Sequence, residues 1–130
     1  METNHFSTLQ MISDRVIKEV TKTAQSMRIN GPSRSQLYST IDHIESFTSL
    51  TTEAVFCSNC DQNVKIDLKQ ISIELLQILR AIVSSWEKND NFMLCDLMEH
   101  ELVDNLIRWK IQIISTLKNQ ATPNQKTTTT

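Results

Sequence analysis

The apolar residues between positions 61 and 88 constrain the fold of this chain more than any other feature of its sequence. They recur in steps of 4, 3, 4, 3, 4 and 4 residues, at Val64, Leu68, Ile71, Leu75, Ile78, Ile82 and Trp86. This spacing places them on one side of an α-helix over residues 61–88. Further apolar residues widen that side: Ile66, Ile73, Leu76, Leu79 and Val83. A helix that is apolar over so much of its circumference is expected to lie at the centre of a bundle or to contact a partner.

Three other segments carry a helical apolar stripe. A helix over residues 7–27 is predicted by Leu9, Ile12, Val16, Val20, Ala24 and Met27. A helix over residues 34–56 is predicted by Leu37, Ile41, Ile44, Thr48, Thr51 and Val55. Its threonines lower the intrinsic helix propensity, so we expect this helix to depend on packing. A helix over residues 91–117 is predicted by Leu94, Met98, Leu102, Leu106, Trp109, Ile113 and Leu117.

Turn-forming residues separate these segments and are otherwise scarce. The 130 residues include one glycine and two prolines, which favours a few long helices over a sheet with many tight turns. Asn30-Gly31-Pro32 ends the first helix, and Asn89-Asp90 joins the last two through a left-handed C-cap and an N-cap. Short loops make successive long helices antiparallel. We therefore predict an all-α, up-down-up-down antiparallel four-helix bundle over residues 1–120, with a disordered tail, ATPNQKTTTT, over residues 121–130.

Charge and hydropathy exclude several classes of function. The formal net charge is −2, so no global attraction to nucleic acid or to an anionic membrane is expected. No run approaches the roughly 18–20 apolar residues that span a bilayer. The N-terminus lacks a basic head followed by an apolar run, and thus does not resemble a secretory signal. We expect a cytoplasmic protein with reduced cysteines, no membrane contact and no cofactor.

Cys57 and Cys60 form a C-x-x-C motif, a spacing found in zinc sites and in redox-active dithiols. Zinc needs about four ligands, and no second C-x-x-C or H-x-x-x-H completes the set locally. In an up-down bundle, Cys95 is expected at the opposite end from this pair. Asp61 beside the motif disfavours a thiolate. A metal- or redox-responsive bundle that uses Cys57 and Cys60 is therefore an alternative, and two thiols at an interhelical corner is the simpler interpretation.

Other chemistry has little support. A single glycine leaves no room for a Gly-rich phosphate loop, and no G-x-S-x-G is present. The di-metal pattern Glu-x-x-His is also missing, although Asp96 and His100 share one helix face. A small DNA-associated regulator is a second alternative, because basic residues gather near the first turn: Lys18, Lys22, Arg28 and Arg34. We expect no enzymatic activity.

Protein interaction is the function that the pattern favours. Apolar residues lie outside the main stripes, and they either fill the core or form a partner surface: Ile66, Ile73, Leu76, Ile107, Ile111 and Ile114. The last hairpin contributes candidate anchors of a partner-binding surface: Trp86, Phe92, Leu94, Met98, Leu102 and Trp109. We predict a module that binds a helix of a protein partner or associates with a second copy of itself.

The hairpin WEKNDNFMLCDLMEHELVDNLIRWK, residues 86–110, resembles the C-terminal hairpin of small all-helical proteins in Gram-positive bacteria, some of them from flagellar or motility gene clusters. The size and helical plan of the chain are also similar to those of flagellar export chaperones. This resemblance implies a chaperone- or adaptor-like bundle that holds an amphipathic helix of its partner. It implies no catalytic residue, and it does not account for Cys57 and Cys60.

Overall fold

The computed structural model describes residues 2–57 and 62–129, with side chains described for residues 7–57 and 62–116. Within these ranges the chain forms four helical rods and no strand. The first three are α1 (Glu2–Asn30), α2 (Arg34–Cys57) and α3 (Gln62–Glu87). The fourth runs without a break through α4 (Asn91–Asp96), a π-helical segment η1 (Leu97–Leu102) and α5 (Val103–Thr129).

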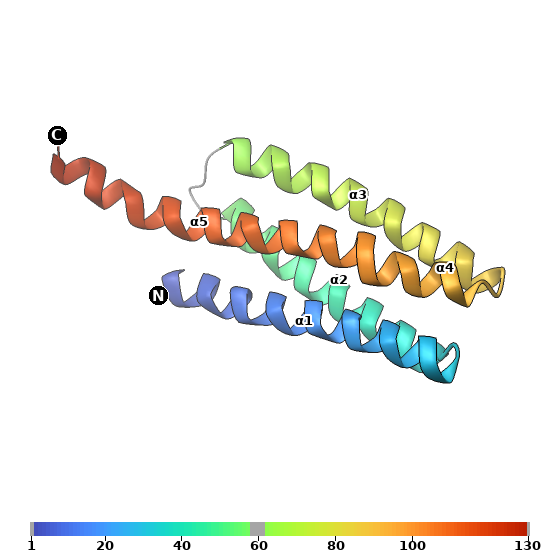
Figure 1. Ribbon diagram of the computed structural model, residues 1–130. Coiled ribbons are helices and arrows are strands. Elements are labelled where there is room, and N and C mark those ends of the chain that lie inside the picture. The colour runs from blue at the N-terminus through green and yellow to red at the C-terminus, as the bar shows by residue number, and fades with distance from the viewer. Residues whose placement is uncertain (1, 58–61, 130) are drawn as a thin grey trace.

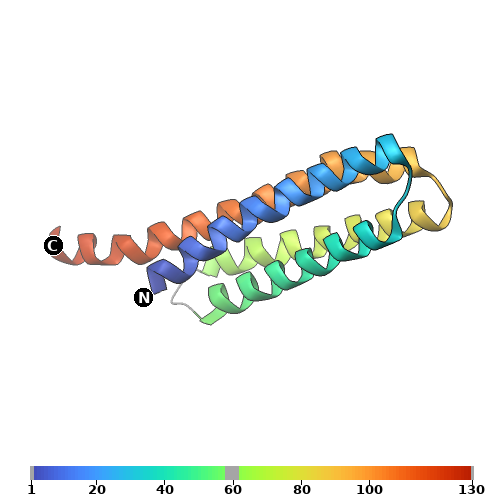
Figure 2. The ribbon, with the colours of Figure 1, turned by 90° about the horizontal axis from the view of Figure 1, so that it is seen from below.

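Successive rods run in opposite directions, which confirms the up-down-up-down bundle (Figures 1 and 2). The turn between α1 and α2 and the turn between α3 and α4 lie together at one end of the bundle, and the last residues of α2 and the first residues of α3 lie at the other (Figure 1). The first rod begins five residues earlier than the stripe predicted. The helix of α5 continues to Thr129, beyond the predicted end at residue 117 and through most of the segment 121–130 that was predicted to be disordered, and side chains beyond Thr116 lie outside the described part.

The turn chemistry follows the sequence prediction. Gly31 has φ +92°, and its N–H donates to the carbonyl of Met27 at 3.0 Å, which closes the C-terminus of α1. Asn89 adopts the left-handed conformation with φ +57°. The carboxylate of Asp90 accepts a hydrogen bond from the N–H of Met93 at 3.1 Å and caps α4. Asn91 Nδ2 also donates to the Met27 carbonyl at 3.0 Å, so the two turns are tied to each other.

The π-helical segment of the fourth rod was not predicted. Each four-residue step in an α-helix carries a side chain about 40° beyond a full turn. Leu94, Met98, Leu102 and Leu106 are separated by three such steps, and in an α-helix they would drift off a common face. The wider turn of η1 absorbs this drift, and all four side chains are buried. The run of equal four-residue steps was the signal for it in the sequence.

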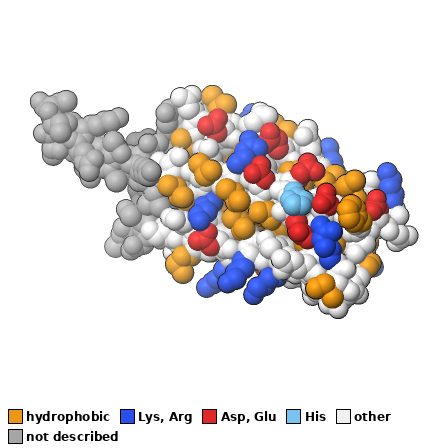
Figure 3. All heavy atoms as spheres, viewed as in Figure 1, with side chains coloured by type: hydrophobic (Ala, Val, Ile, Leu, Met, Phe, Trp, Pro, Cys, Tyr) orange, Lys and Arg blue, Asp and Glu red, His pale blue; other side chains and the backbone are white. Residues whose placement is uncertain are grey.

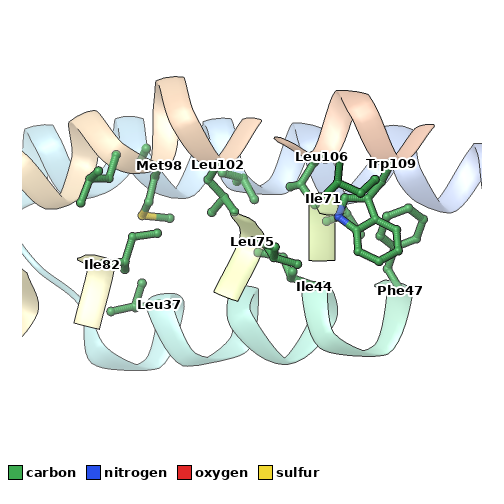
Figure 4. Packing of buried hydrophobic residues seen from close by; sticks show 14 of the residues in the cluster. Leu37, Ile44, Phe47, Ile71, Leu75, Ile82, Met98, Leu102, Leu106 and Trp109 are labelled. Atoms are coloured by element: carbon green, nitrogen blue, oxygen red, sulfur yellow. The ribbon is translucent and has the colours of Figure 1, made fainter. Parts of the chain in front are cut away.

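The core runs along the axis of the bundle. Buried side chains from α2, α3 and the fourth rod point toward one another in Figure 4. Most members of the predicted stripes are buried, and those that are only half-buried are Ile12, Ile41, Thr48, Ile78 and Trp86. The packing is uneven: α1 lies closely against α2 and α5, and α3 against α5, whereas α2 and α3 approach each other at few places. The bundle is therefore open along one side.

Candidate functional site

A groove of about 480 Å³ lies on the open side, between α2 and α3. The two helices supply its walls, and α5 reaches its floor through one side chain. The lining residues are Ile44, Glu45, Thr48, Ser49, Thr52, Glu53, Ser72, Leu75, Leu76, Leu79 and Trp109. Apolar carbon dominates the surface at the bottom, because Ile44, Leu75 and Trp109 belong to the buried core.

The α2 wall includes two threonines whose hydroxyls are already bonded. Thr48 Oγ1 donates to the carbonyl of Glu45 at 3.2 Å, and Thr52 Oγ1 donates to the carbonyl of Thr48 at 2.8 Å. Such bonds within one helix occupy the hydroxyl and leave the methyl group as the contacting part of the side chain. Thr48, one of the threonines that weakened the predicted helix, thus presents a methyl group to the groove, as Thr52 does.

The floor is held by a polar contact between α3 and α5. The indole Nε1 of Trp109 donates to Asn105 Oδ1 at 3.0 Å, and Asn105 Nδ2 donates to the carbonyl of Ile71 at 3.1 Å. From α2, Phe47 meets the indole edge-on, with ring centroids 6.3 Å apart at 62° (Figure 4). Residues of three helices therefore position Trp109. Because its indole N–H has a hydrogen-bond partner in the core and its ring packs against Phe47, the orientation of the side chain is fixed.

The α3 wall continues outward as an exposed apolar stripe. Ile66, Ile73, Leu76 and Val83 are 56%, 48%, 52% and 41% exposed. Together with Lys69 and Arg80 they follow steps of 3, 4, 3, 4 and 3, which we call the α3 stripe: Ile66, Lys69, Ile73, Leu76, Arg80 and Val83. This is the spacing of the contact positions in a coiled coil. Ile66, Ile73 and Leu76 were predicted either to fill the core or to face a partner, and Val83 was predicted to widen the apolar side of the helix. The exposure of all four shows that they do not fill the core.

Acidic side chains line the α2 wall of the groove, whereas basic side chains stand on the outward face of α3, outside the groove lining. Glu45 and Glu53 line it from α2. Lys69 and Arg80 are exposed on α3, and neither has an ion-pair partner among the residues whose side chains are described. The acidic Glu74 of α3 points instead toward α5, where it pairs with Arg108. Between Ile66 and Val83 the outward face of α3 is therefore apolar and basic, and the acidic Glu87 is exposed one four-residue step beyond Val83.

The anchors proposed from the sequence do not form one surface. Leu94, Met98, Leu102 and Trp109 are at most 1% exposed, so in this fold they are core residues and not surface anchors. The reason is that the π-helical segment keeps their face toward the bundle axis. Phe92 is 72% exposed at the far end of the bundle, beneath the guanidinium of Arg28.

The remaining candidates are divided between the core and other faces. Trp86 is half-buried and lines a pocket of about 140 Å³ with Pro32 and Leu94 at the turn end. On α5, Ile107 and Ile111 are 41% and 50% exposed, and Ile114 is half-buried.

A polar cluster joins α1 to the π-helical segment. Arg28 Nε donates to Glu99 Oε1 at 2.6 Å, and its guanidinium lies 3.7 Å from Asp96. This hydrogen bond to the Glu99 carboxylate raises the pKa of Arg28 above its ordinary value. His100 lies 3.4 Å from the same Asp96. Charged side chains of both signs gather at this end of the face in Figure 3. Of the basic residues predicted to serve a DNA-associated regulator, Arg28 is thus engaged within the chain, whereas Lys18, Lys22 and Arg34 are exposed.

The cysteines are separated along the bundle. Cys57 is exposed at the end of α2, and Cys95 is buried in α4 near the other end (Figure 1). This agrees with the predicted separation, and Cys60 lies outside the described residues. In the described part of the chain, no three His, Cys, Asp or Glu side chains are grouped so that they could hold a metal ion.

Comparisons with protein-family models, with curated proteins and with solved structures found no match to this chain. In the described residues, no helix combines the length and the apolarity needed to cross a bilayer.

Proposed function

We propose that this protein is a non-enzymatic interaction module that binds an amphipathic α-helix along the α3 stripe and the neighbouring α2–α3 groove. The observation that carries the proposal is the exposure of Ile66, Ile73, Leu76 and Val83 at coiled-coil spacing beside an open groove. An apolar surface of this kind on one element is typical of a partner site.

The spacing favours a helix over an extended peptide. A strand would seek an exposed sheet edge, and the described part of the chain has no strand. A helix laid along α3 would place its own contact residues between the side chains of the α3 stripe. Each of the four apolar side chains keeps about half of its surface exposed, so its burial would contribute on the order of 1 kcal/mol. Such contributions suit reversible binding. Reversible binding of a helix is consistent with the adaptor- or export-chaperone-like role that the sequence resemblance of residues 86–110 implies.

The test uses a fluorescein-labelled helical peptide with leucine at the contact positions and glutamine elsewhere, followed by fluorescence anisotropy. We expect saturable binding to the full chain, and a loss of at least roughly tenfold in affinity for Leu76→Asp, since the change puts a charge in the middle of the apolar contact. Ile111→Asp is the matched control, because Ile111 is equally exposed but lies on α5. Equal losses for the two variants, or no binding to the unaltered chain, would refute the proposal.

A further inference from the structure

The charges within the α3 stripe distinguish between possible occupants. Lys69 stands in the stripe between Ile66 and Ile73, and Arg80 stands between Leu76 and Val83. Both are exposed, and neither has an ion-pair partner among the described side chains. In a docked complex each would face a residue of the bound helix, because contact positions point at the partner. Their charge therefore acts on whatever helix binds there.

A second copy of α3 is a poor occupant. In the antiparallel register that pairs all four apolar residues, Ile66 faces Val83, Ile73 faces Leu76, and Lys69 faces Arg80, since each pair of numbers has the same sum of 149. In a parallel pair, Lys69 faces Lys69 and Arg80 faces Arg80. Both arrangements bring like charges together twice, which opposes association. Other antiparallel registers place Lys69 or Arg80 against an apolar residue and leave part of the apolar stripe uncovered.

We infer that the α3 stripe binds a helix of another protein that carries carboxylates opposite Lys69 and Arg80. This inference rests on the proposed function and specifies its partner. The steps of the stripe read the same in both directions, so the required pattern is the same for parallel and antiparallel docking. Over eighteen residues, from the position opposite 66 to the position opposite 83, it reads apolar-x2-acidic-x3-apolar-x2-apolar-x3-acidic-x2-apolar.

The experiment compares two labelled helical peptides with this pattern, one with glutamate and one with lysine at the two acidic positions, and otherwise identical. Fluorescence anisotropy with the full chain is expected to give at least roughly tenfold tighter binding for the glutamate peptide, and the preference should shrink as salt is raised. In the K69E/R80E variant the preference should reverse. Both changes are on exposed side chains, and circular dichroism of the variant confirms that its helices are intact.

The outcomes separate the inference from the proposed function. Equal binding of the two peptides overturns the charge rule and leaves helix binding intact. Binding of neither peptide overturns both. Sedimentation of the unaltered chain tests self-association: a dimer that Leu76→Asp dissolves would make a second copy the occupant and overturn the inference. A monomer that prefers the glutamate peptide, with reversal in K69E/R80E, supports it.

Discussion

The indole Nε1 of Trp109 donates a hydrogen bond to Asn105 Oδ1 at 3.0 Å, one turn earlier on the same helix. Asn105 in turn donates to the carbonyl of Ile71 on α3. A buried amide therefore fixes the relative position of α3 and α5 directly beneath the groove. Because both ends of the amide are bonded, the contact satisfies polar groups that would otherwise be costly to bury.

Replacing Asn105 by leucine should lower the free energy of unfolding by about 2 kcal/mol, because the indole N–H of Trp109 loses its partner in the core. Urea unfolding, followed by circular dichroism, measures this. Gln70→Leu on the exposed face of α3 is the control and should change stability by less than about 0.5 kcal/mol. Near-equal stabilities of the two variants would mean that the amide contact does not hold α3 against α5.

Thr51 and Thr40 should respond in opposite directions to the same change. Thr51 Oγ1 is buried without a hydrogen-bond partner in the described part of the chain, so Thr51→Val should stabilise the fold by about 1 kcal/mol. Thr40 Oγ1 shares a 3.0 Å hydrogen bond with Thr23 between α1 and α2, and Thr40→Val should destabilise by a similar amount. Thermal and urea unfolding of the two variants test this. A shift of the same sign for both would contradict it.

Cys95 should be slow to alkylate. Burial raises the pKa of its thiol, and the nearby Arg28 guanidinium only partly opposes this. Its thiolate is therefore scarcer than that of an ordinary cysteine at pH 8, and reagent access is blocked. Peptide-resolved mass spectrometry of the reduced protein with iodoacetamide should show Cys57 labelled well before Cys95.

The same shift has a consequence for stability. The pKa of the Cys95 thiol is higher in the folded state than in the unfolded state. At a pH below the unfolded-state pKa, both states keep the proton and stability is unaffected. As the pH rises from the unfolded-state pKa toward the folded-state pKa, the unfolded state loses the proton first, and the protein becomes less stable. Unfolding free energy should thus decline above about pH 8.5, with Cys95→Ser showing a shallower decline than the unaltered chain. Denaturant should abolish the labelling difference between Cys57 and Cys95, which is the control. Fast labelling of Cys95 in the native protein would disprove its burial.

Deleting His100 should be tolerated better than deleting an equally exposed residue from α3. Removal of one residue from η1 converts the steps from Leu94 through Met98, Leu102, Leu106 and Trp109 into 4, 3, 4 and 3, which a regular α-helix keeps on one face. Deleting Gln77 rotates every later core residue of α3 by about 100°. We expect cooperative unfolding to persist in the first variant and to be severely weakened in the second. Similar damage in both would show that the π-helical segment does not absorb an extra residue.

Much of the fold could be predicted because its signals are local. The four helices follow from apolar periodicity, and the turns at Gly31 and Asn89 follow from residues that tolerate positive φ. Antiparallel packing follows from short loops. The separation of Cys57 from Cys95 then follows from topology alone.

The candidate site was harder to predict than the fold, because the burial of a side chain depends on how closely the neighbouring helices approach each other. Periodicity assigned Leu94, Met98, Leu102 and Trp109 to a possible surface, yet the fourth rod turns them all inward. Periodicity also left open whether Ile66 and Ile73 filled the core. A second set of steps of 3 and 4, offset from the main stripe of α3, was the available signal for a second contact face.

The sequence by itself determined the presence of the four helices, the turns at Gly31 and Asn89 and the alternating directions of the helices, since these depend on spacing and on backbone preferences within a few residues. Only the tertiary structure decided that α2 and α3 stand apart while α3 packs on α5. That arrangement depends on side chains distant in sequence, among them Trp109, Asn105 and Phe47, whose contacts join α5 to α3 and to α2. The groove and the exposed α3 stripe are the result of that packing.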